Sequence, residues 1–204
     1  MEPALFNILL QADYPSIINA CQADPRFFKI CRQPYFWQEK AILDFSINPV
    51  AFKSITSRDN KARYEYLMKI EKNEGLVNGA KEDKKKLVEY FLSLGADDYN
   101  GAMNFAAHGG HMDIVKLMLS LGAHDYNWAM RLASRGGHMD IVKLMLSLGA
   151  NTYNSAMRLA SRGGHIDIVK LMISLGANDY NGAMRLAAYG GHMDIVELLK
   201  QYTE

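Results

Sequence analysis

The second half of the chain repeats itself at an interval of 27 residues. Residues 129–150 read AMRLASRGGHMDIVKLMLSLGA and residues 156–177 read AMRLASRGGHIDIVKLMISLGA, so that two positions differ, both apolar for apolar. The same step separates the glycines of four Gly-Ala pairs: Gly95, Gly122, Gly149 and Gly176. Self-similarity at a fixed interval of this length is the signature of a protein built from stacked repeats, each of which contacts only its neighbours.

A fifth, degenerate unit precedes these four. Residues 73–95 read NEGLVNGAKEDKKKLVEYFLSLG, in which Leu76 stands where Met103 stands one step later, and Ala80 where Ala107 stands. A lysine run at 84–86 replaces the His-Met-Asp of the other units. A more polar first unit is expected to act as a cap, because one of its sides has no neighbouring repeat to cover it.

Each unit predicts two short helices. Asn100 and its equivalents are expected to cap the first helix, because an asparagine side chain accepts hydrogen bonds from the free amides of a first turn. The Gly-Gly pair is expected to end that helix. A second helix is predicted from about Asp113 to Leu121, with Gly122 ending it, since its apolar residues recur at helical spacing. These residues are Ile114, Val115, Leu117, Met118 and Leu121. Helices this short are not stable alone, so the pattern predicts an all-α solenoid of helix pairs.

The stretch MNFAAHGGH at 103–111, followed by Asp113-Ile114-Val115, resembles the later part of the ankyrin repeat, T-P-L-H-x-A-A-x-x-G-H with an apolar second helix. The resemblance covers residues 73–204 and recurs in register. The unit has 27 residues instead of about 33, and four residues such as DDYN link one unit to the next. The resemblance therefore implies an ankyrin-like solenoid that lacks the β-hairpin fingers, with its first helices lining the partner-binding surface.

The first helices differ from one another at positions expected to face solvent. These are Asn104, Arg131, Arg158 and Arg185, then His108, Arg135, Arg162 and Tyr189 one turn later, with Trp128 one turn earlier. With about 10 Å between helices, the five arginines form a ladder. Guanidinium groups bind carboxylates and phosphates through paired hydrogen bonds, which favours an acidic or phosphorylated protein partner. In the alternative interpretation each arginine is structural and pairs with an aspartate of a neighbouring linker (Asp98, Asp125 or Asp179) or with carbonyl groups at a helix end. Single-stranded nucleic acid is a weaker third interpretation, because the net charge is only +1.

The sequence carries no pattern for catalysis. Four histidines occur once per unit, and neighbours about 10 Å apart cannot share a metal whose ligands lie about 2 Å from it. We expect each to make a structural hydrogen bond that ties its loop: His111, His138, His165 and His192. No P-loop, G-x-S-x-G or H-E-x-x-H motif is present. We therefore expect no catalytic residue, no metal and no cofactor.

The first 46 residues do not follow the repeat. Apolar clusters are interrupted by Asp-Tyr-Pro at 13–15, Asp-Pro at 24–25 and Gln-Pro at 33–34, which predicts three short helices packed on one another. The segments PALFNILL, IINACQADPRFFKIC and QPYFW resemble the three parts of an F-box. The resemblance implies docking on a Skp-type adaptor through Pro3, Leu5, Ile8, Leu9, Ile17 and Ile18. In the alternative, this segment only caps the first repeat.

The expected organisation is an F-box-like domain at 1–46, a helical linker at 47–72 and repeats at 73–204. Cys21 and Cys31 lie among apolar residues, so buried free thiols are favoured over a disulfide, which points to the cytosol or nucleus. The N-terminus has no basic region of a signal peptide, and no apolar run approaches the ~20 residues that cross a bilayer. We expect a soluble intracellular protein.

Taken together, these features predict a non-catalytic receptor of the F-box–ankyrin type that recruits a target protein to a Skp–cullin ubiquitin ligase. The combination is similar to that of proteins of large DNA viruses. The alternative is a ligase-independent scaffold or decoy that sequesters a partner. The two are distinguished by whether Leu5, Ile8 and Leu9 present an exposed face or are buried.

Overall fold

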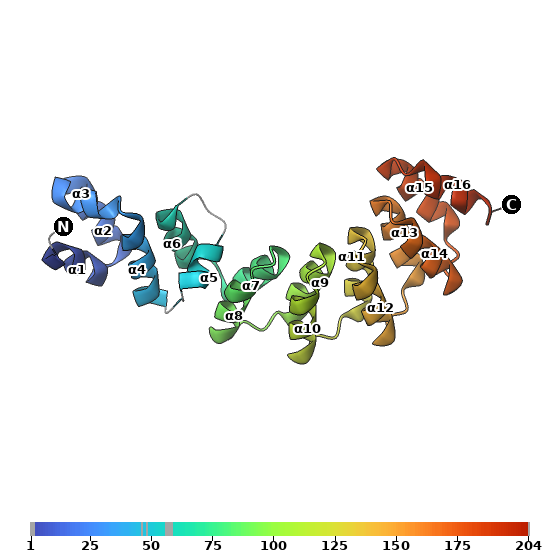
Figure 1. The fold of residues 1–204 in the computed structure, drawn as a ribbon, viewed down its shortest axis with the longest axis horizontal. Helices are drawn as coiled ribbons and strands as arrows, with labels where there is room; N and C mark the ends of the chain where they lie inside the picture. Colours follow the sequence, from blue (N-terminus) through green and yellow to red (C-terminus); the bar gives the residue numbers. More distant parts are fainter. Residues whose placement is uncertain (1–2, 46, 48, 56–58, 204) are drawn as a thin grey trace. The chain divides into compact units, whose positions relative to one another are not determined.

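A computed structural model of the chain describes residues 3–45, 47, 49–55 and 59–203. In this part of the chain all regular elements are helices, which confirms the all-α class (Figure 1). They are α1 (Pro3–Gln11), α2 (Tyr14–Ala23), α3 (Pro25–Cys31), α4 (Pro34–Phe45), α5 (Pro49–Ser54), α6 (Asn60–Lys69), α7 (Lys72–Lys81), α8 (Lys85–Ser93), α9 (Tyr99–Gly109), α10 (Met112–Ser120), α11 (Tyr126–Gly136), α12 (Met139–Ser147), α13 (Tyr153–Gly163), α14 (Ile166–Ser174), α15 (Tyr180–Gly190) and α16 (Met193–Lys200).

The helices form two compact units. The first unit comprises the residues up to Gly75 together with Lys84–Ala96, and the second comprises Leu76–Asp83 together with the residues from Asp97 onward. The domain boundary expected at residue 46 lies outside the described residues. The second unit contains the four clear repeats.

The N-terminal segment contains four helices, so the prediction of three was wrong. At each of the three predicted breaks, one helix ends and the next helix begins. Pro15, Pro25 and Pro34 stand in the first turns of α2, α3 and α4, where a missing N–H costs nothing. Asp13 and Asp24 cap α2 and α3, each accepting a backbone N–H at 2.8 Å. Three breaks therefore give four helices.

The core of the first unit is built on α4. Trp37 and Phe36 of α4 are buried, as are Ile17 of α2 and Ile30 of α3. The Trp37 indole N–H donates to the carbonyl of Cys31 at 2.7 Å, which satisfies its polar atom inside the core. α6 packs on α4 and adds Tyr64, whose ring centroid lies 5.4 Å from that of Trp37. Residues that follow the F-box-like segment therefore share its core.

Cys21 and Cys31 form a disulfide, so the prediction of two free thiols was wrong. α2 and α3 pack against each other and bring the two Cα atoms to 6.3 Å, within the range that a disulfide spans. The sequence spacing of ten residues gave no sign of this approach, because it depends on how the two helices fold back. With the two cysteines joined, they no longer point to a reducing compartment.

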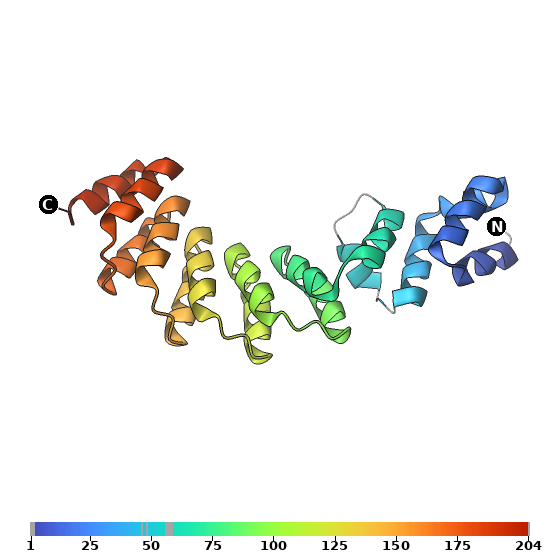
Figure 2. The same ribbon diagram turned by 180° about the vertical axis from the view of Figure 1, so that it is seen from behind.

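The second unit stacks helix pairs in register (Figures 1 and 2). α9, α11, α13 and α15 pack side by side, and each also packs on the second helix of its own repeat. Small residues line the contact between first helices: Ala102, Ala106, Ala129, Ala133, Ala156 and Ala160 are fully buried. On α10, Ile114, Val115 and Met118 are buried as predicted, whereas Leu121 is 40% exposed. Leu121 follows the last helical residue and so leaves the apolar stripe.

The first helix of each repeat begins two residues earlier than predicted. Asp98, Asp125 and Asp179 cap α9, α11 and α15 through their carboxylates, so the prediction of an asparagine cap was wrong. The asparagine lies in the first helical turn, and its side chain points toward the next linker. Asn100 Oδ1 accepts the N–H groups of His124 and Asp125 at 2.8 and 3.0 Å.

The same bridge recurs at each repeat junction that follows. Asn127 Oδ1 accepts the N–H groups of Asn151 and Thr152 at 2.8 and 3.3 Å. Asn154 Oδ1 accepts those of Asn178 and Asp179 at 2.7 and 2.9 Å. One side chain thus satisfies two linker amides of the following repeat, which fixes the register of the stack.

The predicted structural role of the repeat histidines is confirmed for three of them. His138 Nε2 lies 3.0 Å from the carbonyl oxygen of His108, and His165 Nε2 lies 3.0 Å from that of Arg135. His111 Nε2 lies 3.1 Å from the carbonyl of Lys81. Each ring reaches the end of the preceding repeat's first helix. A side chain at Gly136 would collide with the same carbonyl of His108, so glycine there permits the close approach.

Removal of the asparagine bridge is expected to weaken the stack. Asn127→Ala leaves two linker amides without an acceptor and should lower the free energy of unfolding by about 1–2 kcal/mol. Asn181→Ala is the matched control, because Asn181 accepts no backbone N–H from the described residues. Both variants gain the same helix propensity. Urea unfolding midpoints measure the difference; equal midpoints would contradict the bridge.

Candidate partner-binding face

The arginine face consists of Arg131, Arg135, Arg158, Arg162 and Arg185 on α11, α13 and α15. Arg135, Arg162 and Arg185 are exposed, and Arg131 and Arg158 are partly buried. Three predicted flanking residues lie at the surface with them: His108, Trp128 and Tyr189, the last 78% exposed. The regular packing of the first helices brings these side chains to one side of the stack.

Asn104 was predicted to face solvent, and this was wrong. Its side chain is only 7% exposed, and its Oδ1 makes no hydrogen bond with the described residues. The equivalent positions in later repeats carry arginines, whose long side chains reach the surface from the same place on the helix. Asparagine is too short to do so, and Asn104 stays buried in the second unit.

Arg158 takes the structural role that the sequence left open. Its Nη1 lies 3.0 Å from Oδ2 of Asp179, the N-cap residue of the next repeat's first helix. Its Nη2 also lies 3.4 Å from the Ser155 hydroxyl. This arginine links two repeats, and its charge is partly neutralised by the carboxylate. Because the pair is partly exposed, its contribution to stability is small.

Aromatic rings hold two other arginines without neutralising them. The Arg131 guanidinium lies 4.2 Å from the centroid of the Trp128 ring on the same helix. The Arg162 guanidinium lies 5.3 Å from the centroid of the Tyr189 ring on the next first helix. A cation–π contact orients the guanidinium plane and leaves its edge available for hydrogen bonds. Arg131 Nε is itself buried without a hydrogen-bond partner among the described residues, so only the terminal N–H groups of Arg131 remain for a ligand.

The face retains a net positive charge. Among the described residues, Arg158 is the one member of the arginine face within ion-pair distance of a carboxylate. Partial burial lowers the pKa of His108, and the positive charges of Arg135, His138 and Lys81 lower it further. Folding therefore favours the neutral ring, and His108 lowers stability as the pH falls through its ordinary pKa of 6.5.

A further row on this face was missed by the sequence reasoning. Phe105 is 42% exposed, and its equivalents are partly buried: Leu132, Leu159 and Leu186. Each stands four residues after the position of Gly101 or Trp128, and so on the same side of the helix. The signal was available, because these apolar residues recur every 27 positions like the arginines. The face is therefore a double row of arginines beside an apolar row.

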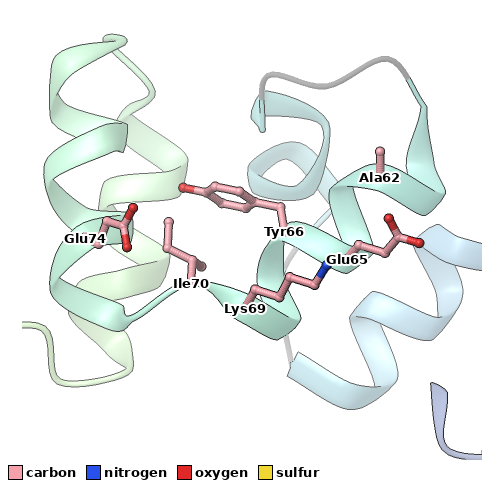
Figure 3. A pocket seen from close by; sticks show the side chains of 6 residues that line it. All are labelled: Ala62, Glu65, Tyr66, Lys69, Ile70 and Glu74. Carbon is pink, nitrogen blue, oxygen red and sulfur yellow. The ribbon is translucent and has the colours of Figure 1, made fainter. Parts of the chain in front are cut away.

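A small pocket in the first unit offers no comparable chemistry (Figure 3). It is lined by Ala62, Glu65, Tyr66 and Lys69 of α6, Glu74 of α7, and Ile70 in the link between these helices. The Glu65 carboxylate already accepts the Tyr14 hydroxyl and lies 3.7 Å from Lys61 Nζ. The other residues that line the pocket include a lysine and a glutamate beside apolar side chains. Nor do the described residues hold a cluster of three or more His, Cys, Asp or Glu side chains arranged to bind a metal.

A stack of helix pairs in which one face carries charged and aromatic side chains defines a repeat protein of the binding type. The family model for ankyrin repeats (3 copies) matches residues 76–154 and 129–204. The chain therefore belongs to the ankyrin repeat family, whose members are typically non-catalytic modules that bind proteins. No curated protein matches the chain. Within the described residues, every helix is too short or too polar to cross a membrane.

Proposed function

We propose that this ankyrin repeat protein is a non-catalytic receptor that captures an acidic segment of a partner protein on its arginine face. The observation that carries the proposal is the set of four arginines without a carboxylate partner among the described residues: Arg131, Arg135, Arg162 and Arg185. Guanidinium groups left with free N–H groups bind carboxylates and phosphates in paired geometry.

The charge is local, which favours a defined anionic segment over a generally acidic surface. The whole chain has a net charge of only +1, so long-range attraction by the protein as a whole is weak. The exposed aspartates of the second helices, such as Asp113 and Asp140, further offset distant positive charge. Trp128 and Tyr189 are residue types enriched at protein interfaces, and they flank the arginines. A short acidic segment lying along the first helices meets all of these groups.

A labelled twelve-residue oligoglutamate peptide tests the proposal. Fluorescence anisotropy should detect binding at low salt, and Arg135→Glu with Arg162→Glu should weaken it about tenfold or more, because two attractive contacts become repulsive. The matched control is Lys116→Glu with Lys143→Glu, which makes the same charge change at exposed residues of α10 and α12. That control should retain binding.

Thermal unfolding of the arginine variant should stay close to that of the parent, because both residues are exposed and neither pairs with a carboxylate in the described part of the chain. Equal loss in the arginine and lysine variants would reduce the binding to net charge and refute the proposed site. Tighter binding of a random single-stranded oligonucleotide than of the peptide would replace a protein partner by nucleic acid.

We further propose that the N-terminal helices α1 to α4 act as an F-box that docks on a Skp-type adaptor, so that the captured partner is presented to a ubiquitin ligase. Support comes from exposed apolar residues on these helices. Ile8 is 58% exposed, and Pro3 is exposed beside the partly buried Leu5. Ile18 and Phe28 line a pocket with Trp37, which suits an apolar side chain of a partner.

Two of the six predicted adaptor residues do not fit that role. Leu9 and Ile17 are 2% and 0% exposed, because they pack into the core of the first unit, and so they hold the helices together. The candidates that remain are Pro3, Leu5, Ile8 and Ile18. If this surface binds no adaptor, the chain is a scaffold or decoy that sequesters its partner without a ligase.

Size-exclusion chromatography with a purified Skp-type adaptor distinguishes these two roles. The parent protein is expected to co-elute with the adaptor, and Ile8→Asp should abolish the complex by placing a charge in an apolar contact. Val50→Asp is the matched control, since Val50 belongs to the same unit and is 61% exposed. A folded parent protein that elutes alone would leave the scaffold role.

A further inference from the structure

The repeat sets a fixed distance between equivalent side chains of the arginine face. Packed helices lie about 8–10 Å apart. Here the first helices pack closely, because alanines line the contact and the His138 ring reaches the carbonyl of His108 in the preceding repeat. Arg135 and Arg162 occupy identical positions in successive repeats, and Arg131, Arg158 and Arg185 do so in the parallel row. Anion sites along the face therefore recur every 8–10 Å.

Only some backbone conformations can place anions at this step. A β-strand rises about 3.3 Å per residue and alternates its faces, so side chains on one face recur about every 6.6 or 13 Å. A polyproline II helix rises about 3.1 Å per residue with three residues per turn, so side chains on one face recur about every 9.3 Å. The polyproline II repeat matches the helix spacing, and the strand repeats do not.

The apolar groups on the same face agree with this conformation. Polyproline II segments are recognised on surfaces lined by aromatic residues, because the rings pack on proline and its neighbours. Phe105, Trp128 and Tyr189 are all substantially exposed here. The partly buried row of Leu132, Leu159 and Leu186 adds apolar area beside the arginines.

We infer that the face recognises a polyproline II segment that carries an anionic side chain at every third residue. Arg135 and Arg162 meet the first two anions. On α15 the equivalent position is Tyr189, so the row of Arg135 and Arg162 supplies two anion sites, and Arg185 belongs to the parallel row one helical turn away. The residues between the anions pack on the aromatic and leucine side chains. This inference rests on the proposed function, since it specifies the partner of the same face, and carboxylates and phosphates both satisfy it.

Peptides of equal composition test the spacing directly. The first has four repeats of Glu-Pro-Pro, the second has four consecutive glutamates before eight prolines, and the third has glutamate at every second position followed by the remaining prolines. All three peptides are rich in proline and carry the same net charge, so they differ only in the spacing of their glutamates. At physiological salt the first is expected to bind at least tenfold more tightly than the others.

Two further arms complete the experiment. Arg162→Gln should remove the preference for the first peptide, because two adjacent anion sites are needed to sense spacing, whereas Lys143→Gln on α12 should preserve it. A phosphoserine series with the same three spacings identifies the anion. A spacing preference in the phosphoserine series and none in the glutamate series would assign phosphate. A preference in the glutamate series and none in the phosphoserine series would assign carboxylate.

The possible failures are separable. If all peptides bind equally to the parent in both series and lose binding equally in Arg162→Gln, the register is refuted while the acidic-partner function stands. If neither these peptides nor oligoglutamate bind a folded protein, both the register and the proposed function are refuted.

Discussion

The stack depends on side chains of one repeat that satisfy backbone groups of the next. Asn100, Asn127 and Asn154 each accept two linker amides of the following repeat, as Asn127 does from Asn151 and Thr152. At the other end of that helix, the His138 ring reaches the carbonyl of the preceding helix. On α11 these two contacts fix both ends of the helix relative to its neighbours, and the same kinds of contact are made by three asparagines and three histidines along the stack. Short helices that are unstable alone thereby become a regular array.

The regular array turns sequence variation into a surface. The bridging residues are the same in each repeat, whereas the positions between them change, so arginine, tryptophan and tyrosine occur at defined steps along one side. Arg158 is used to join repeats, and the remaining arginines keep their charge. The binding specificity proposed here follows from the spacing of the array, because a partner must present anions at the interval that helix packing sets.

The period, the helix pairs and the small-residue contacts were predictable from the sequence, because each repeats in register. The cap residue was not, since Asp98 and Asn100 both suit a helix start and only the geometry assigns one to the cap and the other to the next linker. The burial of Asn104 and the approach of Cys21 to Cys31 depend on neighbouring helices. The row of Phe105 was predictable, because Phe105, Leu132, Leu159 and Leu186 recur at the same interval of 27 residues.

Native-state hydrogen exchange of the linker amides tests the central claim most directly. The amides of Asn151, Thr152, Asn178 and Asp179 lie outside helices, yet Asn127 and Asn154 accept their N–H groups. The account predicts that these amides exchange as slowly as those inside the flanking helices, because they open only when two repeats separate. Exchange at the rate of an unstructured peptide would show that the asparagine bridges do not hold the stack in register.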